Sequence, residues 1–433
     1  MNSINNNKNM KVLVAGGVGR EHAIVHKLSK SPRVSKLYAV PGNAGIAAYA
    51  ECLPYSATDI DNIVKVALEL KIDLAVVGPE NPLNLGLVDK LTEKNIRAFG
   101  PDKAAARLEG SKVFAKALMK KYNIPTADYR TFSDAEKASV YIKDKNLYPL
   151  FIKADGLAFG KGAIKAESYT EAANIIKMIM TDRVFGESGN DIVIEEFLTG
   201  TEVTVLAFTD GKTVVPMISA QDHKQVFDND EGSNTGGMGA FSPSKIYTPE
   251  LAERCMNEIY LPTVNAMNKE NCPFKGVIYF QLIITPSGPK VIEYNARFGD
   301  PETQVILPKL KTDLIDIIDA VIDGNLSDIN IEWSDEAAVC VVMASGGYPD
   351  KYDAGFEISG LDKFKDRDDI IIYHAGTKFN ADNKYITSGG RVLCVTALAD
   401  DMQTAIAKAY KAIDCIHFHN SHYRKDIGQK YLI

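Results

Sequence analysis

Short apolar runs separated by longer amphipathic stretches mark the first hundred residues of the chain. The run Val12–Ala15 is followed by glycines and then by a segment whose apolar positions, among them Ala23, Ile24 and Leu28, recur with helical spacing. Three further apolar runs, "KLYAV", "IDLAVVG" and "IRAFG", lead into glycine or proline turns. This alternation predicts a parallel α/β domain over residues 10–110, and the loops at the carboxyl ends of its strands should line a ligand crevice.

The pattern changes after residue 110. Short strands surround a glycine-bearing loop in "LFIKADGLAFGKGAIKA", and two longer strands form a hairpin around "TPSGPK". Beyond residue 335, strands such as "AVCVVMA" and "GRVLCVTAL" predict a mixed domain that closes one wall of the site. The segment "LIDIIDAVIDGNL" has the apolar spacing of a core helix. The chain is therefore expected to be α/β and α+β, with domains over residues 10–110, 111–332 and 335–433 behind a disordered tail at residues 1–9. Residues from about 130 to 200 are expected to form a lid inserted in the middle domain.

Composition narrows the class of protein. The 433 residues carry a net charge of −7 without a basic block, so nucleic acid is not an expected partner. No apolar stretch is long enough to span a membrane, and the start "MNSINNNKNM" is not a signal peptide. The six cysteines are scattered without a CxxC pair, which is typical of free thiols in a reducing compartment. These features predict a cytoplasmic protein without a membrane partner.

A glycine-rich turn joins the first strand to the first helix. Gly16, Gly17 and Gly19 leave backbone N–H groups free at the positive end of the helix, which suits a phosphate. A dinucleotide site would need an acidic residue about twenty residues further on, at the end of the second strand. That strand ends instead in "VPGNAG". The turn therefore indicates a phosphate ester rather than nicotinamide, and the alternative is a tight turn without a ligand.

Two lysines and a strand end indicate a nucleotide. Lys153 on a strand and Lys161 in the following loop can reach a polyphosphate from two sides, although a hairpin with solvated lysines is the alternative. No GxxxxGK[ST] motif is present, so this is not a Walker loop. The strand at residues 192–194 runs into a short hinge suited to an adenine ring. The residues of this hinge are Glu195, Glu196, Phe197 and Leu198. Glu202 then lies where it can accept hydrogen bonds from ribose hydroxyls.

The second strand of the "TPSGPK" hairpin carries a candidate metal site. Glu293 and Asn295 are two residues apart, so both side chains should lie on one face of the strand. Two oxygen ligands beside a polyphosphate describe a magnesium site completed by phosphate and water. The alternative is two polar residues on an exposed face. The dense polar turn from Arg297 to Glu302 directly afterwards favours the site.

Residues 233–243, "SNTGGMGAFSP", contain too much glycine for a helix and too few large side chains for a core. Most such stretches are surface loops. The order of motifs gives another interpretation. The strand lysine, the glycine loop with its lysine, the "EEFL" hinge and the E-x-N strand resemble the ATP-grasp superfamily. The motifs "GREHA", "PGNAG", "KADGLAFGKG", "QDHK", "NTGGMGAFSP" and "RFGDPETQ" are similar to those of the glycinamide ribonucleotide synthetase family, and this likeness covers essentially everything after the tail.

The resemblance implies an ATP-dependent ligase of de novo purine biosynthesis. The carboxylate of glycine would attack the γ-phosphate of ATP to give glycyl phosphate and ADP. The amine of 5-phosphoribosylamine would then attack the acyl carbon, which gives glycinamide ribonucleotide and phosphate. ATP and Mg²⁺ (or Mn²⁺) would be the cofactors, and catalysis would consist of positioning and electrostatic stabilisation. A monomer is expected.

The resemblance also implies roles for individual residues. Arg297 would stabilise the transferred phosphoryl group, and Asp300 would bind the ammonium group of glycine. Gly237 would bring its backbone close to glycyl phosphate, with Thr235 and Gly236 beside it. Asp222 and Lys224 of "QDHK" would lie near phosphoribosylamine or the nucleotide. The phosphoribosyl group would occupy an N-terminal crevice formed by Gly17, Gly19, Asn43 and Glu80.

Two positions depart from the pattern of the relatives. Val18 stands where the family usually has glycine, and Gln281 stands where many ATP-grasp enzymes have a second glutamate. A neutral amide is a weaker magnesium ligand, so the metal is expected to rest on Glu293 and Asn295 with extra water. Three alternatives stay open: another ATP-grasp carboxylate–amine ligase of nucleotide metabolism, an oxidoreductase, and a nucleotide-binding module without catalysis.

Two groups of histidines have spacings found in metal sites. His22 and His26 stand four residues apart, as zinc ligands on a helix do, but no third ligand is evident. The stretch "HFHNSH" is expected to be a solvated turn.

Overall fold

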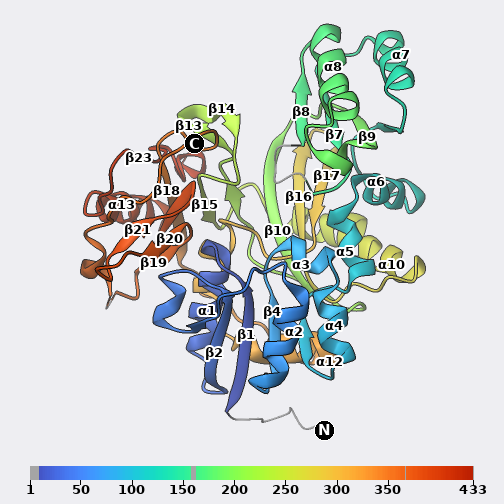
Figure 1. Ribbon diagram of the computed structural model, residues 1–433. Helices are drawn as coiled ribbons and strands as arrows, with labels where there is room; N and C mark the ends of the chain where they lie inside the picture. Colours follow the sequence, from blue (N-terminus) through green and yellow to red (C-terminus); the bar gives the residue numbers. More distant parts are fainter. Residues whose placement is uncertain (1–8, 158–161, 366, 433) are drawn as a thin grey trace.

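The computed structural model describes residues 9–157, 162–365 and 367–432. Figure 1 shows the N-terminal domain at the base of the molecule, the C-terminal domain at its side and a small helix-covered sheet above the central sheet. This mixed α/β, multidomain architecture confirms the fold class expected from the sequence. Of the predicted tail at residues 1–9, all but the last residue lies outside the described ranges.

The N-terminal domain is built on a five-stranded parallel sheet of order β3-β2-β1-β4-β5. Its strands are β1 (Met10–Gly16), β2 (Val34–Pro41), β3 (Glu51–Cys52), β4 (Leu74–Val77) and β5 (Arg97–Phe99), and its helices are α1 (Gly19–Ser29), α2 (Ile60–Glu69), α3 (Glu80–Asn84), α4 (Leu87–Glu93) and α5 (Lys103–Gly110). The strand order reverses between β1 and β4, so the loops that follow these two strands open onto one crevice. Gly17 and Glu80 both lie in that position.

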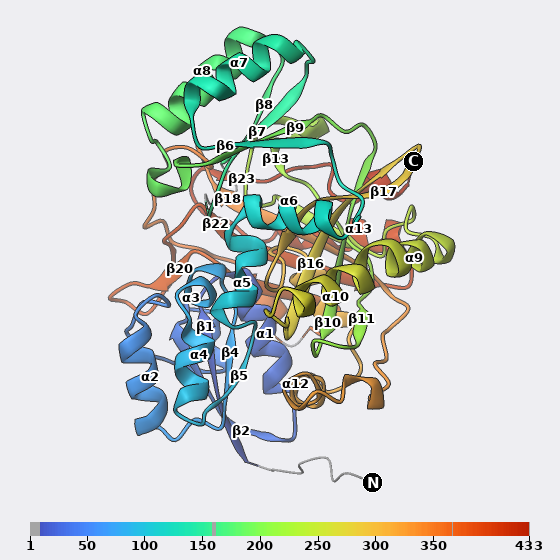
Figure 2. The ribbon, with the colours of Figure 1, turned by 90° about the vertical axis from the view of Figure 1, so that its right-hand side faces the viewer.

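The central sheet is antiparallel and has the order β11-β10-β16-β17. Its strands are β10 (Thr201–Thr209), β11 (Val214–Pro216), β16 (Gly276–Thr285) and β17 (Gly288–Asn295). The helices α6 (Lys112–Lys121), α9 (Pro249–Cys255) and α10 (Leu261–Lys269) lie beside it, as Figure 2 shows. The predicted hairpin around "TPSGPK" is β16 and β17.

A second antiparallel sheet, of order β6-β9-β7-β8, falls within the predicted lid at residues 130–200 except for its first residue. It consists of β6 (Tyr129–Phe132), β7 (Leu150–Ala154), β8 (Ala163–Ala166) and β9 (Ile192–Glu196), and α7 (Ala135–Lys145) and α8 (Tyr169–Ile176) cover it. Whether this unit moves as a lid stays a prediction.

The C-terminal sheet recruits two strands from the middle of the chain. Its order is β12-β15-β18-β22-β19, and β23 also pairs with β18. The strands are β12 (Gln221–Asp222), β15 (Gly239–Ser242), β18 (Ala337–Ser345), β19 (Ile370–His374), β22 (Arg391–Ala399) and β23 (Ser421–His422), with helix α13 (Met402–Ile413) against them. The remaining strands form two short hairpins. One pairs β13 (Gln225–Phe227) with β14 (Glu231–Asn234), and the other pairs β20 (Thr377–Phe379) with β21 (Tyr385–Thr387). The "QDHK" and "NTGGMG" motifs therefore bridge the central and C-terminal domains.

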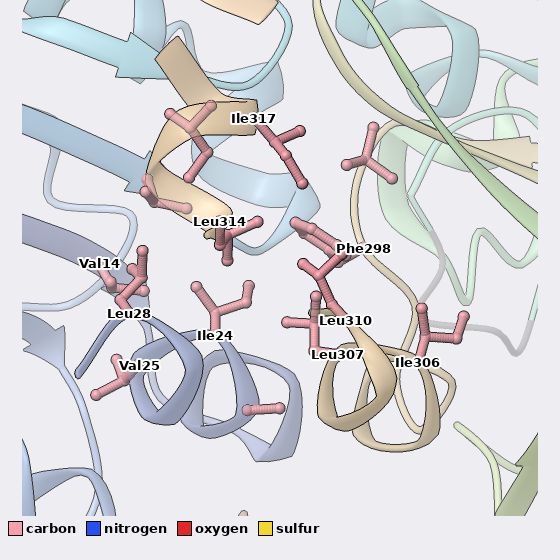
Figure 3. Close-up of a cluster of buried hydrophobic side chains, with 14 of the residues drawn as sticks. Val14, Ile24, Val25, Leu28, Phe298, Ile306, Leu307, Leu310, Leu314 and Ile317 are labelled. Carbon is pink, nitrogen blue, oxygen red and sulfur yellow. The ribbon is translucent and has the colours of Figure 1, made fainter. Parts of the chain in front are cut away.

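One hydrophobic core joins the N-terminal domain to the segment after β17. Figure 3 shows Ile24 and Leu28 of α1 facing Phe298 and Leu314. Helices α11 (Thr303–Ile306) and α12 (Leu314–Asp323) complete this core, so "LIDIIDAVIDGNL" forms the core helix predicted from its spacing. Burial of each large aliphatic side chain stabilises the contact by about 1.5–3 kcal/mol. The glycine turn at the start of α1 is thereby fixed beside the "RFGDPETQ" segment.

Two expectations from the composition can be compared with the structure. All six cysteines are free thiols. Within the described residues, the helices are too short or too polar to cross a lipid bilayer.

Candidate active site

Loops far apart in the sequence meet around Asp300. A Cβ atom at Gly19 would lie 3.4 Å from Asp300 Oδ1 and less than 3.0 Å from Gln304 Nε2. A Cβ atom at Gly237, where φ is +113°, would lie less than 3.0 Å from Pro301 Cδ. Close backbone approach therefore requires glycine at both positions. The structure brings together three of the motifs singled out in the sequence.

Lys153 belongs to a buried cluster with a lysine that the sequence interpretation missed. Glu195 Oε2 lies 3.1 Å from Nζ of Lys153 and 3.1 Å from Nζ of Lys116. Burial lowers the pKa of Lys116 to about 8, although Glu195 opposes this shift. Lys116 lies on α6 among the buried residues Ala115, Leu118 and Met119. A lysine on the apolar face of a helix was the signal that could have identified it.

Glu195 lies on strand β9 rather than in the loop that follows it, and its contact with the nucleotide stays a prediction. Glu195 and Glu196 are the last residues of β9, and the hinge starts at Phe197. The side chain of Glu195 is directed into the interior because two buried ammonium groups neutralise it there. Its Oε1 atom is buried and has no hydrogen-bond partner among the described residues. One acceptor therefore remains for a ligand N–H or O–H, as a bound nucleotide would provide.

The hinge itself connects β9 to β10. The ring of Phe197 stacks on Phe151 with 5.8 Å between centroids, and Lys165 Nζ lies 4.4 Å from the Phe197 centroid. Glu196 accepts a hydrogen bond from the Asp128 N–H at 3.0 Å and pairs with Lys290 at 3.4 Å. Its carboxylate thus fastens this sheet to β17. The contacts of Phe197 and Leu198 with adenosine stay predictions, and Lys161 lies outside the described residues.

A β-bulge turns Glu293 and Asn295 away from the core. The register between β16 and β17 passes from Leu282↔Val291 to Gln281↔Glu293, so Ile292 is an extra residue. Val291 and Tyr294 are consequently both buried although they are three residues apart. Bulges re-aim side chains in this way beside many functional sites. Without this one, Glu293 would share the buried face of Val291.

The electrostatic surroundings of Glu293 fit a site for a metal and phosphate. Burial alone would raise its pKa, but Lys224, Lys153 and Lys112 outweigh burial and lower it. The carboxylate is therefore ionised near neutral pH. Asn295 Oδ1 accepts a hydrogen bond from Arg297 Nη2 at 3.1 Å.

The side chains of Glu293 and Asn295 offer hard oxygen ligands, but two side chains do not complete the coordination of a metal ion. Among the described residues, no group of three or more His, Cys, Asp or Glu side chains could hold a metal by itself. Gln281, opposite Glu293, donates to Glu202 Oε2 at 2.8 Å and so adds no carboxylate. A divalent ion held by Glu293 and Asn295 would accordingly take its remaining ligands from phosphate and water.

The "QDHK" segment contributes Lys224, whose ammonium group pairs with the carboxylate of Glu202. Lys224 Nζ lies 3.1 Å from Glu202 Oε2, so this carboxylate oxygen is shared between Lys224 and Gln281. Burial raises the pKa of Asp222 to about 7. The charge of Lys224 lowers this pKa, whereas the charges of Glu302 and Glu202 raise it further. A carboxyl group that titrates near neutrality can exchange a proton with a bound amine.

Arg297 is held by two glutamates. Its Nε lies 3.1 Å from Glu80 Oε2, and its Nη2 lies 3.0 Å from Glu109 Oε1. Burial would raise the pKa of Glu80, but Arg297 and Arg20 lower it to about 2. Burial raises the pKa of Glu109 to about 7 although Arg297 opposes this. Glu80, expected in the phosphoribosyl crevice, is therefore paired with Arg297, and Glu109 is a second partner that the sequence did not reveal. Contact of Glu80 with the phosphoribosyl group stays a prediction.

Both carboxylate oxygens of Asp300 accept hydrogen bonds within the protein. Arg391 Nη2 lies 2.7 Å from its Oδ2, and Gln304 Nε2 donates to its Oδ1 at 2.6 Å. Arg391 Nη1 donates to the carbonyls of Gly236 at 2.6 Å and Asp300 at 2.9 Å. Arg391 thus ties the glycine loop to the "RFGDPETQ" segment, a link that only the tertiary structure reveals. Binding of a glycine ammonium group to Asp300 stays a prediction.

The amides of the glycine loop have protein acceptors. The Gly236 N–H donates to the Tyr348 hydroxyl at 3.0 Å, and the Gly237 N–H donates to Thr235 Oγ1 at 2.9 Å. Glycyl phosphate would have to replace these acceptors to reach either N–H. The catalytic role of Gly237 therefore stays a prediction, supported so far by the close packing at this residue.

A cavity of about 350 Å³ lies between the N-terminal and C-terminal domains. Its lining is Gly17, Val18, Gly42, Asn43, Tyr348, Ala375, Gly376, Thr377, Ser388, Gly389, Gly390 and Arg391. Asn43 Nδ2 donates to the carbonyls of Gly17 at 3.0 Å and His374 at 2.8 Å, and its Oδ1 accepts from the N–H groups of Gly45 and Ile46. Because all four bonding positions are used, Asn43 shapes the cavity rather than offering a free group to a substrate. Eight of the twelve lining residues come from the C-terminal domain, and none of these eight was assigned from the sequence.

His22 connects these two domains. Its Nδ1 accepts a hydrogen bond from the His374 N–H at 2.8 Å, and burial lowers its pKa well below the ordinary value. The spacing of His22 and His26 is thus explained by domain contact. In "HFHNSH", His422 Nε2 lies 2.8 Å from the Val226 carbonyl, so this histidine is bonded to the chain and not merely solvated.

The fold and the lysine–glutamate strands define an ATP-grasp protein. Biotin carboxylase from Campylobacter jejuni, at 16% identity, shares the fold with a TM-score of 0.75 over 98% of this chain and 95% of that one. A crystal structure of phosphoribosylamine–glycine ligase from Thermotoga maritima is more similar, with a TM-score of 0.83, 32% identity and coverage of 96% and 100%.

The chain belongs to the phosphoribosylglycinamide synthetase family. Residues 10–109 match its N domain, residues 110–303 its ATP-grasp (A) domain and residues 338–430 its C domain. The phosphoribosylamine–glycine ligase of Caldanaerobacter subterraneus is 49% identical over 98% of this chain and 100% of the relative. The trifunctional purine biosynthetic protein adenosine-3 of Gallus gallus is 46% identical over 97% of this chain, which corresponds to 42% of that longer protein.

Proposed function

We propose that this protein joins glycine to 5-phosphoribosylamine while ATP is converted to ADP and phosphate, and that the product is glycinamide ribonucleotide. One observation carries the proposal. Relatives named phosphoribosylamine–glycine ligase are 45–49% identical to the chain and are matched over 97–100% of their own lengths. Residues from all three matched domains converge around Asp300, which supports a site at this position.

The nucleotide would lie between the two antiparallel sheets. When bound, ATP supplies the phosphoryl group that activates the carboxylate, and a divalent ion, proposed to be Mg²⁺ or Mn²⁺, neutralises phosphate charge. Lys153 and Lys116 provide buried positive charge, and the orphaned Oε1 of Glu195 accepts a hydrogen bond from the nucleotide. Glu293 and Asn295 provide the oxygen ligands.

The acyl-transfer centre would lie where Arg297, Asp300 and the glycine loop meet. Arg297 carries a fixed positive charge because Glu80 and Glu109 hold its guanidinium in place. The amine of phosphoribosylamine must lose a proton as it attacks glycyl phosphate. Asp222, with a pKa of about 7, is the proposed acceptor.

The phosphoribosyl group would occupy the cavity of about 350 Å³ between the N-terminal and C-terminal domains. Its glycines leave backbone groups accessible, and Gly17 lies just ahead of the amino end of α1, which favours an anion. The guanidinium of Arg391 lies at the side of this cavity that faces Asp300. With its phosphate at Gly17, the substrate would direct its amine toward the acyl-transfer centre.

An ADP-release assay tests the proposal. Release is expected only when glycine, freshly prepared phosphoribosylamine and a divalent metal are all present, and omission of any one should abolish sustained release. ADP release with another carboxylic acid and not with glycine would overturn the proposed substrate. We further propose a monomer that acts in the cytoplasm, which light scattering and cell fractionation would test.

A further inference from the structure

The loop over the proposed acyl-transfer centre is the base of an exposed hairpin. Strands β13 and β14 form this hairpin, and all four residues of β14 are exposed. At its base, the Thr235 N–H and Oγ1 both donate to the Lys224 carbonyl, at 2.8 and 2.7 Å. The Gly237 N–H in turn donates to Thr235 Oγ1. The orientation of the hairpin therefore sets the positions of Lys224 and Gly237.

The hairpin cannot hold itself in place by packing. Of its residues, Val226 is buried, whereas Phe227 is half exposed. Its turn contains Asn229 and Asp230 at φ +60° and +57°, a region that residues with a Cβ atom rarely adopt. Contacts from outside the hairpin must stabilise this geometry.

Those contacts come from the last residues of the described chain. Arg424 is completely buried and forms a forked pair with Asp426, with Nε–Oδ1 at 2.7 Å and Nη2–Oδ2 at 2.6 Å. Its Nη1 reaches the hairpin and donates to the Gln225 carbonyl and to Asp230 Oδ1, both at 3.1 Å. One buried guanidinium thus bonds the C-terminal segment to the start of β13 and to the turn that precedes β14.

Neighbouring residues reinforce the same attachment. Asp426 Oδ2 accepts from the Asn229 N–H at 2.9 Å, and Asp228 Oδ1 accepts from the Lys425 N–H at 2.7 Å. Lys430 pairs with Asp230 at 2.6 Å. Arg424 and Lys430 lower the pKa of Asp230, so this carboxylate stays ionised at neutral pH.

We propose that Arg424 is a positioning residue for the ligase reaction. Through Gln225 and Asp230 it holds the hairpin so that Lys224 and the glycine loop lie at the acyl-transfer centre. This inference rests on the proposed function, because the reaction defines what is being positioned. ATP binding should not depend on Arg424, since the proposed nucleotide and metal ligands lie on β7, α6, β9 and β17.

The test compares Arg424→Lys and Asp230→Asn with a matched control. Lysine at position 424 keeps the charge but cannot form the forked pair with Asp426. Asp230→Asn weakens the attachment of the hairpin from its exposed side and leaves the C-terminal core unaltered. Arg367→Lys is the control, because Arg367 forms the same forked pair with Asp369, two residues later, at 2.7 and 2.8 Å on the surface. The measurements are glycine-dependent turnover, nucleotide affinity by calorimetry and amide hydrogen exchange.

Arg424→Lys should reduce kcat by about 10- to 100-fold, because a displacement of catalytic groups by about 1 Å slows reactions by factors of this size. Nucleotide affinity should stay within about twofold. Amide exchange should accelerate in residues 225–237, and Asp230→Asn should show the same changes to a smaller extent. Wild-type turnover and exchange in both variants would overturn the inference. Faster exchange throughout the C-terminal domain, without a selective effect on the hairpin, would also overturn it. Exchange is measured without substrates, so it remains decisive if the wild-type protein fails to use glycine.

Discussion

Replacing Gly237 with alanine tests the glycine loop most directly. The new Cβ atom would lie less than 3.0 Å from Pro301 Cδ and 3.4 Å from the Asp300 carbonyl oxygen. A positive φ costs a residue with a Cβ atom about 1–2 kcal/mol, and forced overlap in a packed site adds about 1–3 kcal/mol. Ordinary carbon–carbon contact needs about 3.5–4 Å, so the loop must withdraw from Pro301 by about 1 Å.

A shift of this size at an acyl-transfer centre should lower kcat/KM for glycine by about a hundredfold. Nucleotide affinity, measured by calorimetry, should stay unchanged because Lys153, Lys116 and Glu293 lie on other elements. Gly324→Ala is the matched control, since Gly324 also has a positive φ of +77° but no atom within 4 Å of its added Cβ. Equal turnover in Gly237→Ala and Gly324→Ala would refute the proposed contact with Pro301, because backbone strain alone would then explain any loss of activity.

Three further predictions concern charge. Glu293→Gln should lower turnover by about a hundredfold or more, because stabilisation of the transferring phosphate by a metal ion is worth several kcal/mol. Near-normal activity at low magnesium would contradict the assignment, and the melting temperature checks that the variant is folded. Lys116→Met should weaken nucleotide binding about tenfold or more in calorimetry, since it removes one of two ammonium groups beside Glu195; unchanged affinity would show that Lys116 serves the fold alone. Glycine-dependent kcat/KM should fall as pH drops through about 7, because Asp222 can accept a proton only when ionised; Asp222→Asn should remove this dependence, and an unaltered profile would exclude Asp222 as the acceptor.

The sequence by itself determined the local structure of this protein and the class of its chemistry. The apolar run Val12–Ala15 and the glycine turn after it predict a buried parallel strand before a helix, and β1 and α1 have this form. The spacing of "LIDIIDAVIDGNL" predicts the core helix α12. Such features depend on neighbours within a few residues, so periodicity and turn chemistry reveal them. The ordered motifs were sufficient to identify the family.

Only the tertiary structure decided which polar groups remain free for a ligand. The side chains of Asn43, Glu80 and Glu195 are bonded within the protein to groups that are distant in sequence, and Glu195 keeps one oxygen without a partner among the described residues. Lys116 and Arg391 attracted no assignment, yet folding brings them beside Lys153 and Asp300. The bulge at Ile292 likewise exists only in the pairing of two strands. A side chain's partners depend on long-range packing, and a local pattern of residue types contains no information on the distance between two separate segments.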